Sequence, residues 1–351
     1  MAEVRERYDN LDGLRAISCL CIIAMHINAN ADYTLHPLLD TIIASWTHFV
    51  PLFLMISGFG MFCGYYERFK SGSINLNSFF TKRYKKILPF FITLILIDIV
   101  MDRSLTNVIE GITEATLVFG LLPNNQPEVI GVCWTLGIIF LFYMLFPFVV
   151  YLCWNKRRAW LTFIGSLVLS FFCSIYYFTD KFVIGEFVPR HSFLYCAPWL
   201  IVGGLIYLYR ENIKTTISHY KWISIIIAFS ITVIWYFIPG NINGIDIWVF
   251  KNLLVFVPWL MISISLKSKL LSNRVARYFS LISLELYLAQ MILFRVVEKM
   301  NMLYIFGHDW KSLLFSFLII VVGLVVFIEI WKRVFNLLSK YCRARGININ
   351  E

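Results

Sequence analysis

Charged residues are scarce in this chain of 351 residues. Asp, Glu, Lys and Arg together make up 15% of it, whereas a soluble globular protein carries about 25%. Hydrophobic residues account for 59% of the chain, and the mean hydropathy is +0.73. This composition excludes an ordinary soluble protein and predicts an all-α protein that crosses a membrane several times.

Motifs of several enzyme and metal-protein classes are also missing. The sequence has no Gly-rich phosphate loop, no Walker motif and no evident Ser–His–Asp order. Its eight cysteines lack metal-ligand spacing, and seven lie in apolar runs, where cysteine behaves as a small hydrophobic residue. We therefore expect free buried thiols, no metal site and no permanently bound cofactor. No removable signal peptide is expected, because no small-residue cleavage site follows the first apolar segment.

Long apolar segments fill most of the chain. About ten of them reach, or nearly reach, the roughly 17–25 residues that a membrane-spanning helix needs. Their expected limits are 12–29, 49–66, 87–102, 129–153, 159–178, 192–209, 222–238, 247–266, 278–297 and 312–331. The amphipathic stretches 36–48 and 105–121 suit the membrane surface, and a further one, 75–86, leads into the third span. We expect a single transmembrane domain over residues 1–351 with no appended soluble domain.

The distribution of Lys and Arg predicts the orientation of these spans. With the N-terminus inside, cytoplasmic segments hold 23 of the 31 basic residues and outer loops hold 5. The other three, Arg15, Lys251 and Arg295, lie within spans. This asymmetry predicts a multi-pass protein of the cytoplasmic (inner or plasma) membrane with both termini in the cytoplasm. The net charge of +10 is then a topology signal, with membrane lipids rather than nucleic acid as its partner.

Two ionisable residues lie in the first apolar segment. Arg15 and His26 are eleven positions apart, so on a helix they share one face, about 16 Å apart along the axis. Such residues at membrane depth usually face a protein interior or a water-filled cavity and indicate a functional site. A histidine with a pKa of about 6.5 can accept a proton from a hydroxyl at neutral pH. His26 is therefore a candidate base, and a purely structural imidazole is the alternative.

A cluster of cations marks the cytoplasmic end of the third span. Lys82, Arg83, Lys85 and Lys86 stand just before Pro89. Flanking charge of the positive-inside kind explains such a cluster by itself. Arg83 and Lys86 are nevertheless three residues apart on one helix face, where two cations could hold phosphate groups such as those of coenzyme A.

Small and aromatic residues give two weaker signals. Ser57 and Gly58 form a small step in the second span, where either another helix or an acyl chain could approach closely. Trp134 stands at the outer start of the fourth span. An aromatic residue there is normally an interface anchor, and stacking on a carbohydrate is the alternative.

An acid lies inside the ninth span. Glu285 has Tyr287 and Gln290 as polar neighbours, and an intramembrane Glu needs a partner. Arg295, Lys251 and Arg15 are all candidates for that partner.

Five motifs, in this order, resemble the integral-membrane acyltransferase-3 family. The first is YDNLDGLRAISCLCIIAMHIN, which matches an Asp-Gly-Leu-Arg start and an Arg, ten residues, then His. The next are LFLMISGFG, similar to Phe-x-x-x-Ser-Gly-Phe, and KRYKKILP, similar to Arg-x-x-Arg-x-x-Pro with Lys86 in place of the second Arg. The last are CWTLGIIFLFYMLFP, similar to Trp-Ser-Leu…Phe-Tyr…Pro, and LELYLAQ, similar to Tyr-x-x-His with Gln290 in place of His. Ile139 also departs, because many members have Glu there.

The resemblance implies a ten-helix enzyme that moves an acyl group, usually acetyl from acetyl-CoA, to a hydroxyl of a bacterial envelope or exported glycan, as in exopolysaccharide biosynthesis. Acetyl-CoA, or another acyl-CoA, is then the donor substrate. The implied catalytic residues are His26 and Arg15. The implied donor-binding residues are Arg83, Lys86, Lys82, Ser57 and Gly58. The implied acceptor-binding or supporting residues are Asp12, Trp134, Glu285, Tyr287 and Gln290.

Two other functions remain alternatives. A transporter or flippase of a small molecule or lipid-linked glycan also fits ten helices with a few buried polar groups. Such transporters typically consist of two related halves with broken helices, and no repeated segment is found here. The concentration of polar residues in the first three spans favours the enzyme. A catalytically silent relative that works within glycan-assembly machinery is the third reading, suggested by Ile139 and Gln290.

Overall fold

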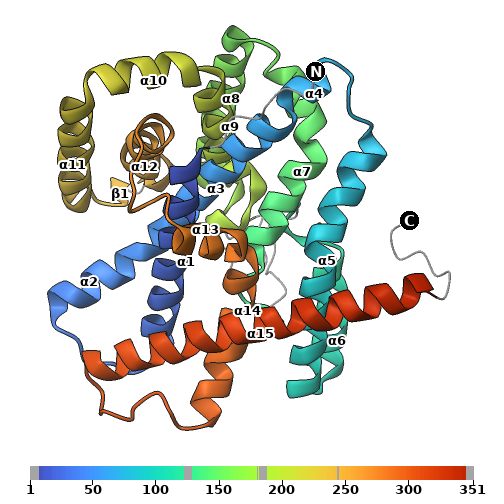
Figure 1. Ribbon diagram of the computed structural model, residues 1–351. Coiled ribbons are helices and arrows are strands. Elements are labelled where there is room, and N and C mark those ends of the chain that lie inside the picture. The colour runs from blue at the N-terminus through green and yellow to red at the C-terminus, as the bar shows by residue number, and fades with distance from the viewer. Residues whose placement is uncertain (1–7, 122–128, 180, 182–187, 243–244, 345–351) are drawn as a thin grey trace. The chain divides into compact units, whose positions relative to one another are not determined.

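The computed structural model describes residues 8–121, 129–179, 181, 188–242 and 245–344 (Figure 1). Within this part the chain is almost entirely helical. Two short strands, β1 (Asn241–Ile242) and β2 (Ile245–Asp246), pair antiparallel, with Asn241 opposite Asp246. The predicted all-α class is confirmed.

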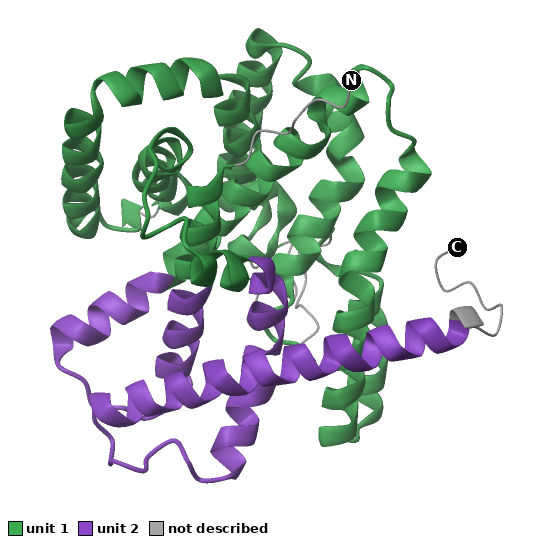
Figure 2. Ribbon diagram, in the orientation of Figure 1, with its two compact units in different colours: residues 1–18, 47–280 green, residues 19–46, 281–351 purple. Residues whose placement is uncertain are grey.

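The chain divides into two compact units (Figure 2). Unit 1 comprises residues 1–18 and 47–280, and unit 2 comprises residues 19–46 and 281–351. Helix α1 (Asp9–Ala29) is continuous across this division, so its start belongs to unit 1 and its end to unit 2.

Unit 1 holds most of the helices. After the start of α1 they are α3 (Phe49–Met61), α4 (Glu67–Lys70), α5 (Leu76–Met101), α6 (Leu105–Ala115), α7 (Trp134–Leu152), α8 (Lys156–Phe172), α9 (Phe193–Leu208), α10 (Arg210–His219), α11 (Lys221–Phe237), α12 (Trp248–Ser265) and α13 (Arg274–Leu281). The π-helical turns Phe62–Tyr66 and Cys173–Tyr177 continue α3 and α8. Short 3-10 helices cover Trp46–His48, Phe119–Leu121 and Pro189–His191.

Unit 2 contains the end of α1, α2 (Pro37–Ser45), α14 (Ser283–Lys299) and α15 (Trp310–Ala344). Helix α14 packs along α15. The end of α1 is tied to α14 by the Cys19 thiol, which donates to the Ser283 carbonyl at 3.3 Å.

Six helical segments in the described part of the chain are long and apolar enough to cross a membrane. They are Asp9–Ala29, Pro37–Lys70, Trp134–Leu152, Lys156–Tyr177, Trp248–Ser265 and Trp310–Cys342. Two bent pairs bring the number to eight if each counts as one span: α9 with α10, bent by 75°, and α13 with α14, bent by 69°. The protein is therefore a multi-pass membrane protein, while the count of ten spans and the placement of both termini stay predictions.

Three helices differ from their predicted limits for local reasons. Helix α5 starts eleven residues before the predicted third span, because Asn75 caps it and its side chain accepts a hydrogen bond from the Asn77 amide at 2.7 Å. The predicted ninth span is broken at Ile282, between α13 and α14. Helix α15 runs beyond residue 331, since apolar side chains continue at helical spacing at Val334, Leu337, Leu338 and Tyr341.

Close helix packing in unit 1 depends on small residues. A Cβ atom on Gly58 of α3 would collide with the Leu200 carbonyl of α9, and one on Gly203 of α9 would collide with the Met55 carbonyl. Helix α9 therefore occupies the small step that Ser57 and Gly58 form. The Ser57 hydroxyl itself donates to the Phe53 carbonyl one turn earlier, at 2.9 Å.

Candidate functional site

The predicted pair of ionisable residues lies on one continuous helix. Helix α1 has no break between Arg15 and His26, so the expected separation of about 16 Å along its axis holds. Both side chains are half-buried. Arg15 belongs to unit 1 and His26 to unit 2, and the surroundings of each are described within its own unit.

Arg15 and Arg83 both interact with Tyr143 in unit 1. The Arg83 guanidinium hydrogen-bonds the Tyr143 side chain and lies 4.9 Å from the centre of its ring. Tyr143 also interacts electrostatically with Arg15. Residues from α1, α5 and α7, which are far apart in the sequence, thus interact through Tyr143.

Aromatic rings, rather than a carboxylate, surround Arg83. Its guanidinium lies 4.5 Å from the ring centre of Tyr65 and 5.6 Å from that of Phe79. Among the described residues no carboxylate pairs with Arg83, and its buried Nε atom has no hydrogen-bond partner there. A buried donor of this kind usually finds a partner, and an anionic ligand could supply it.

Asp12 supplies the negative charge beside Arg15. The two interact electrostatically, and the Ser280 hydroxyl of α13 donates to Asp12 Oδ1 at 2.8 Å. Asn10 fixes the same end of α1, because its side-chain amide donates to the Leu266 carbonyl and accepts from the Ser268 amide. The start of α1 is therefore held to the segment that joins α12 and α13.

The other predicted donor-binding residues lie on different surfaces. Lys82 and Lys86 are exposed on α5, whereas Arg83 on the same helix is half-buried. Gly58 faces α9, as described above. Arg83 and Arg15 therefore share Tyr143 as an interaction partner, and the two lysines lie at the surface.

Trp134 has a neighbour that the sequence did not indicate. Its ring stacks on His191, with centroids 4.7 Å apart and planes at 25°, and the Arg190 guanidinium lies 5.9 Å from it. Trp134 is only 8% exposed. Burial, with the nearby Arg190 charge, lowers the pKa of His191 to about 4, so this imidazole is neutral at pH 7. Trp134 thus packs in the protein and presents little ring surface to a sugar.

The sequence also did not indicate a role for His48, whose ring is held by a hydrogen bond to another helix. His48 Nδ1 lies 2.8 Å from Oδ1 of Asn252, and the Asn252 amide nitrogen donates to the Trp248 carbonyl at 2.8 Å. Because the amide nitrogen is used, Oδ1 is the acceptor, so the neutral imidazole carries its proton on Nδ1. Its ring packs on Trp235 at 4.6 Å and on Trp248 at 5.2 Å. The only sequence signal was an Asn in the apolar run of α12, which does not reveal its partner.

Glu114 of α6 is a fully buried acid that lies beside the segment just before α7. It accepts hydrogen bonds from the Ile130 amide at 2.9 Å and from the Cys133 thiol at 3.4 Å. Burial raises the pKa of Glu114 to about 7. The carboxyl group ties the amphipathic helix α6 to the segment that leads into Trp134.

The remaining predicted residues lie on α14 in unit 2. Gln290 is 2% exposed; its amide donates to the Tyr287 carbonyl at 2.9 Å, and its Oε1 has no partner among the described residues. His26 and Gln290 each stand seven positions after the Cys19–Ser283 contact between α1 and α14. In the predicted topology both helices run outward, so this equal offset is expected to place the two side chains at one level. Glu285 lies in the first turn of α14 and is half-buried.

Cysteines and acids form no metal centre in the described part of the chain. No group of three or more His, Cys, Asp or Glu side chains there is close enough to hold a metal ion. None of the eight cysteines, all of which lie in the described ranges, forms a disulfide, and five of them are buried.

Comparisons with known proteins give the family. A family model described as an acyltransferase domain, that of the acyltransferase-3 family, matches residues 8–332. An uncharacterized protein of Haemophilus influenzae is 26% identical over 202 residues, which make up 50% of this chain and 80% of the relative. No solved structure matches the chain. Because the family model covers nearly the whole chain, including Arg15, His26 and Arg83, the protein belongs to the acyltransferase-3 family and is an enzyme that transfers an acyl group to a hydroxyl.

Proposed function

We propose that this protein transfers an acyl group, acetyl in the first instance, from acyl-CoA to a hydroxyl of a cell-envelope or exported glycan. The observation that supports this proposal most directly is the meeting of Arg15 and Arg83 at Tyr143. Two guanidinium groups near one tyrosine, with Asp12 as the carboxylate beside Arg15, suit an anionic donor.

The phosphates of coenzyme A are the expected ligands of this cluster. Arg83 offers its buried Nε donor, and its planar guanidinium can hold two phosphate oxygens at once. Lys82 and Lys86 are exposed on the same helix and attract the phosphates from the cytoplasm. Gly58 contributes indirectly, because it keeps α3 close to α9, and Ser57 lies next to it on α3.

His26 acts as general base in this proposal. It accepts the proton of the acceptor hydroxyl as the hydroxyl oxygen attacks the thioester carbonyl carbon. The carbon–sulfur bond then breaks, and the coenzyme A thiolate leaves and takes up a proton. Gln290, which stands where the family resemblance expects His, orients the imidazole or the acceptor through its amide. Glu285 and Tyr287 support this end of α14, and Trp134 supports the start of α7.

The enzyme works in the cytoplasmic membrane, beside the machinery that assembles the glycan. Its donor comes from the cytoplasmic side, where the basic residues of α5 are predicted to lie.

Loss of thioester from acetyl-CoA by the purified protein tests the proposal. The assay is run in nanodiscs, with mixed envelope glycans as acceptor, for wild type, His26→Ala and Arg83→Ala. We expect His26→Ala to lower kcat by about 100-fold or more, as for other general bases. We expect Arg83→Ala mainly to raise the KM for acetyl-CoA.

Matched variants control for general effects. His219→Ala removes an exposed histidine of α10, and Arg157→Ala removes an exposed arginine of α8. Both should keep wild-type rates. Full activity of folded His26→Ala would refute the role of His26. Absence of acetyl-CoA binding by folded wild type would refute the donor and favour either the transporter or the silent relative.

A further inference from the structure

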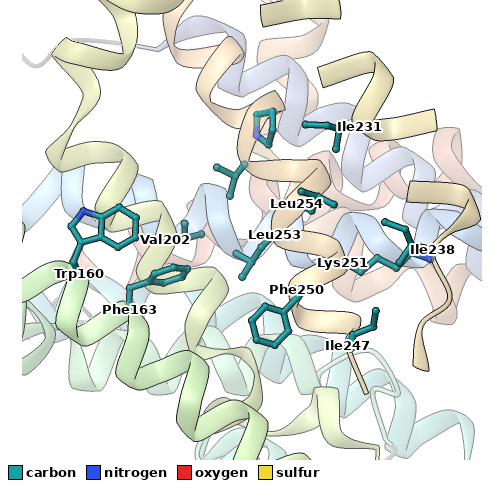
Figure 3. Close-up of a pocket in the computed structure, with 12 residues that line it drawn as sticks. Trp160, Phe163, Val202, Ile231, Ile238, Ile247, Phe250, Lys251, Leu253 and Leu254 are labelled. Atoms are coloured by element: carbon teal, nitrogen blue, oxygen red, sulfur yellow. The ribbon is translucent and has the colours of Figure 1, made fainter. Parts of the chain in front are cut away.

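An apolar hollow of about 600 Å³ lies in unit 1 between α8 and α9 on one side and α11 and α12 on the other (Figure 3). Eleven of the twelve side chains that line it are apolar, and the exception is Lys251. None of these residues belongs to the site around Tyr143. This lining therefore suits a ligand that is mostly hydrocarbon and carries one negatively charged group.

A second apolar hollow lies next to the first. Its volume is about 410 Å³, and it is lined by residues of α8 from Ile164 to Phe172 and by Phe250 of α12. Phe250 lines both hollows, so the two adjoin at this residue. We call the two hollows together the α8–α12 furrow.

The furrow is open to its surroundings at membrane-spanning segments. Phe250 and Leu254 are each 46% exposed, and Ile164 is 51% exposed. Helices α8 and α12 both belong to segments that can cross a membrane. The occupant of the furrow therefore comes from the lipid phase.

The length of the furrow matches one leaflet. On α12 the lining residues extend from Ile247 to Pro258, which corresponds to about 16 Å of helix. The hydrocarbon core of a bilayer is about 30 Å thick, so the furrow is deep enough for the chains of a single leaflet.

Lys251 lies at one end of the furrow, one turn after α12 begins. Its ammonium group is 4.3 Å from the ring centre of Trp235. No carboxylate within the described ranges forms an ion pair with it. Trp235 and Tyr236 lie at the end of α11, and Trp248 lies at the start of α12, on either side of the β1–β2 connection. Aromatic residues at the ends of membrane helices are typical of the level of lipid headgroups. The charge of Lys251 is thus available to a lipid phosphate.

We propose that the α8–α12 furrow binds an anionic phospholipid with two acyl chains. The phosphate contacts Lys251, and one chain lies on each side of Phe250. Two hollows that meet at one ring account for two chains, and one lysine accounts for one negative headgroup. The site requires neither the acyl donor nor the acceptor.

Native mass spectrometry of the full chain tests this site. The protein is released from nanodiscs that contain equal amounts of phosphatidylglycerol and phosphatidylcholine, and the retained lipids are counted. We expect wild type to retain one phosphatidylglycerol. Lys251→Met should lower the ratio of retained phosphatidylglycerol to phosphatidylcholine about fivefold, and Lys251→Arg should keep it. Leu254→Trp, which fills the larger hollow, should lower retention of both lipids.

Lys221→Met is the matched control. Lys221 also lies over a tryptophan, 5.0 Å from the ring centre of Trp222, but it does not line the furrow. This variant should retain lipid as wild type does. Equal ratios for wild type and Lys251→Met, or an equal loss in Lys221→Met, would overturn the proposal.

The number of chains is tested separately. Nanodiscs doped with lysophosphatidylglycerol, which has one chain, should give retention well below that of phosphatidylglycerol. Equal retention of the two lipids would overturn the assignment of two chains. Detection of a dimer without bound lipid, which would mean that a second copy of the protein covers the furrow, would overturn it as well. Unchanged melting temperatures of the variants establish that a loss of lipid is not a loss of fold.

Discussion

Tyr143 contacts Arg83 of the proposed donor site through two separable features. Its hydroxyl takes part in the hydrogen bond with Arg83, and its ring lies under the same guanidinium. Tyr143→Phe removes only the hydroxyl. Hydrogen bonds to charged groups contribute about 1.5–3 kcal/mol, so we expect the Kd for acetyl-CoA to rise by about 10- to 100-fold in calorimetric titrations. Tyr143→Ala should raise it further.

Tyr151→Phe is the control for this prediction. Tyr151 is on the same helix and lies under Arg158, with 4.6 Å between the guanidinium and the ring centre. Tyr151 lies eight residues after Tyr143 on α7. The Tyr151→Phe protein should therefore bind acetyl-CoA as wild type does. An unchanged Kd for both Tyr143 variants would show that Tyr143 does not position Arg83 for the donor.

The raised pKa of Glu114 predicts that the stability of the protein depends on pH. Its pKa of about 7 in the folded protein exceeds the ordinary value of 4.5, so the folded state binds more protons than the unfolded state between these values. The contribution of Glu114 to the stability of the folded state should therefore be largest below pH 4.5. This contribution should be lost as the pH rises through about 7, and the loss should be about 3 kcal/mol at most. Melting temperatures of detergent-solubilised protein between pH 5 and 8 measure this.

Glu114→Gln should flatten that dependence, because the amide does not titrate. Glu67→Gln, at an exposed acid of α4, should leave it as in wild type. If Glu114→Gln and wild type lose stability equally with pH, other groups cause the loss.

The relative position of two site residues could be predicted from the sequence only where both lie on the same helix. The spacing of Arg15 and His26 follows from helical periodicity, and α1 has the continuous helix that this spacing assumed. Tyr143 and His48 gained their roles from partners on other helices. No pattern within a single segment indicates such partners, because they depend on tertiary packing.

At the scale of helices, Gly58 decides how closely α3 and α9 pack. An added methyl group would meet the Leu200 carbonyl, which is backbone and cannot rotate away. We expect Gly58→Ala to destabilise the protein by about 1–3 kcal/mol, seen as a lower melting temperature. Gly165→Ala, on α8 with no neighbouring atom within 4 Å, should be neutral or slightly stabilising. Equal melting temperatures of Gly58→Ala and wild type would contradict this packing.

Helix positions followed from hydropathy better than helix ends did. Hydropathy placed apolar helices at α7, α8 and α12 within a few residues of their observed limits. The predicted amphipathic stretch 75–86 matches the first part of α5, although the span itself was expected to start at residue 87. Hydropathy missed the end of α15, which is amphipathic. It also missed the break at Ile282, because no Gly or Pro marks it in the sequence.

At the scale of the whole molecule, the distribution of basic residues predicts which loops face the cytoplasm. Ser73, between α4 and α5, should lie inside, and Asn241, in β1, should lie outside; both are exposed. A membrane-impermeant maleimide should label Asn241→Cys but not Ser73→Cys in intact cells, and both after lysis. Unsubstituted protein measures the background from native cysteines. The reverse pattern would invert the topology.

The aromatic surroundings of Arg83 have a consequence for the lifetime of the enzyme. A site whose cation has rings for neighbours is most stable when an anion occupies it. Donor at 100 times its Kd would add about 2.7 kcal/mol to the stability of the folded state. Cells rich in acyl-CoA would then degrade this enzyme more slowly, so the supply of donor would set the amount of enzyme as well as its rate.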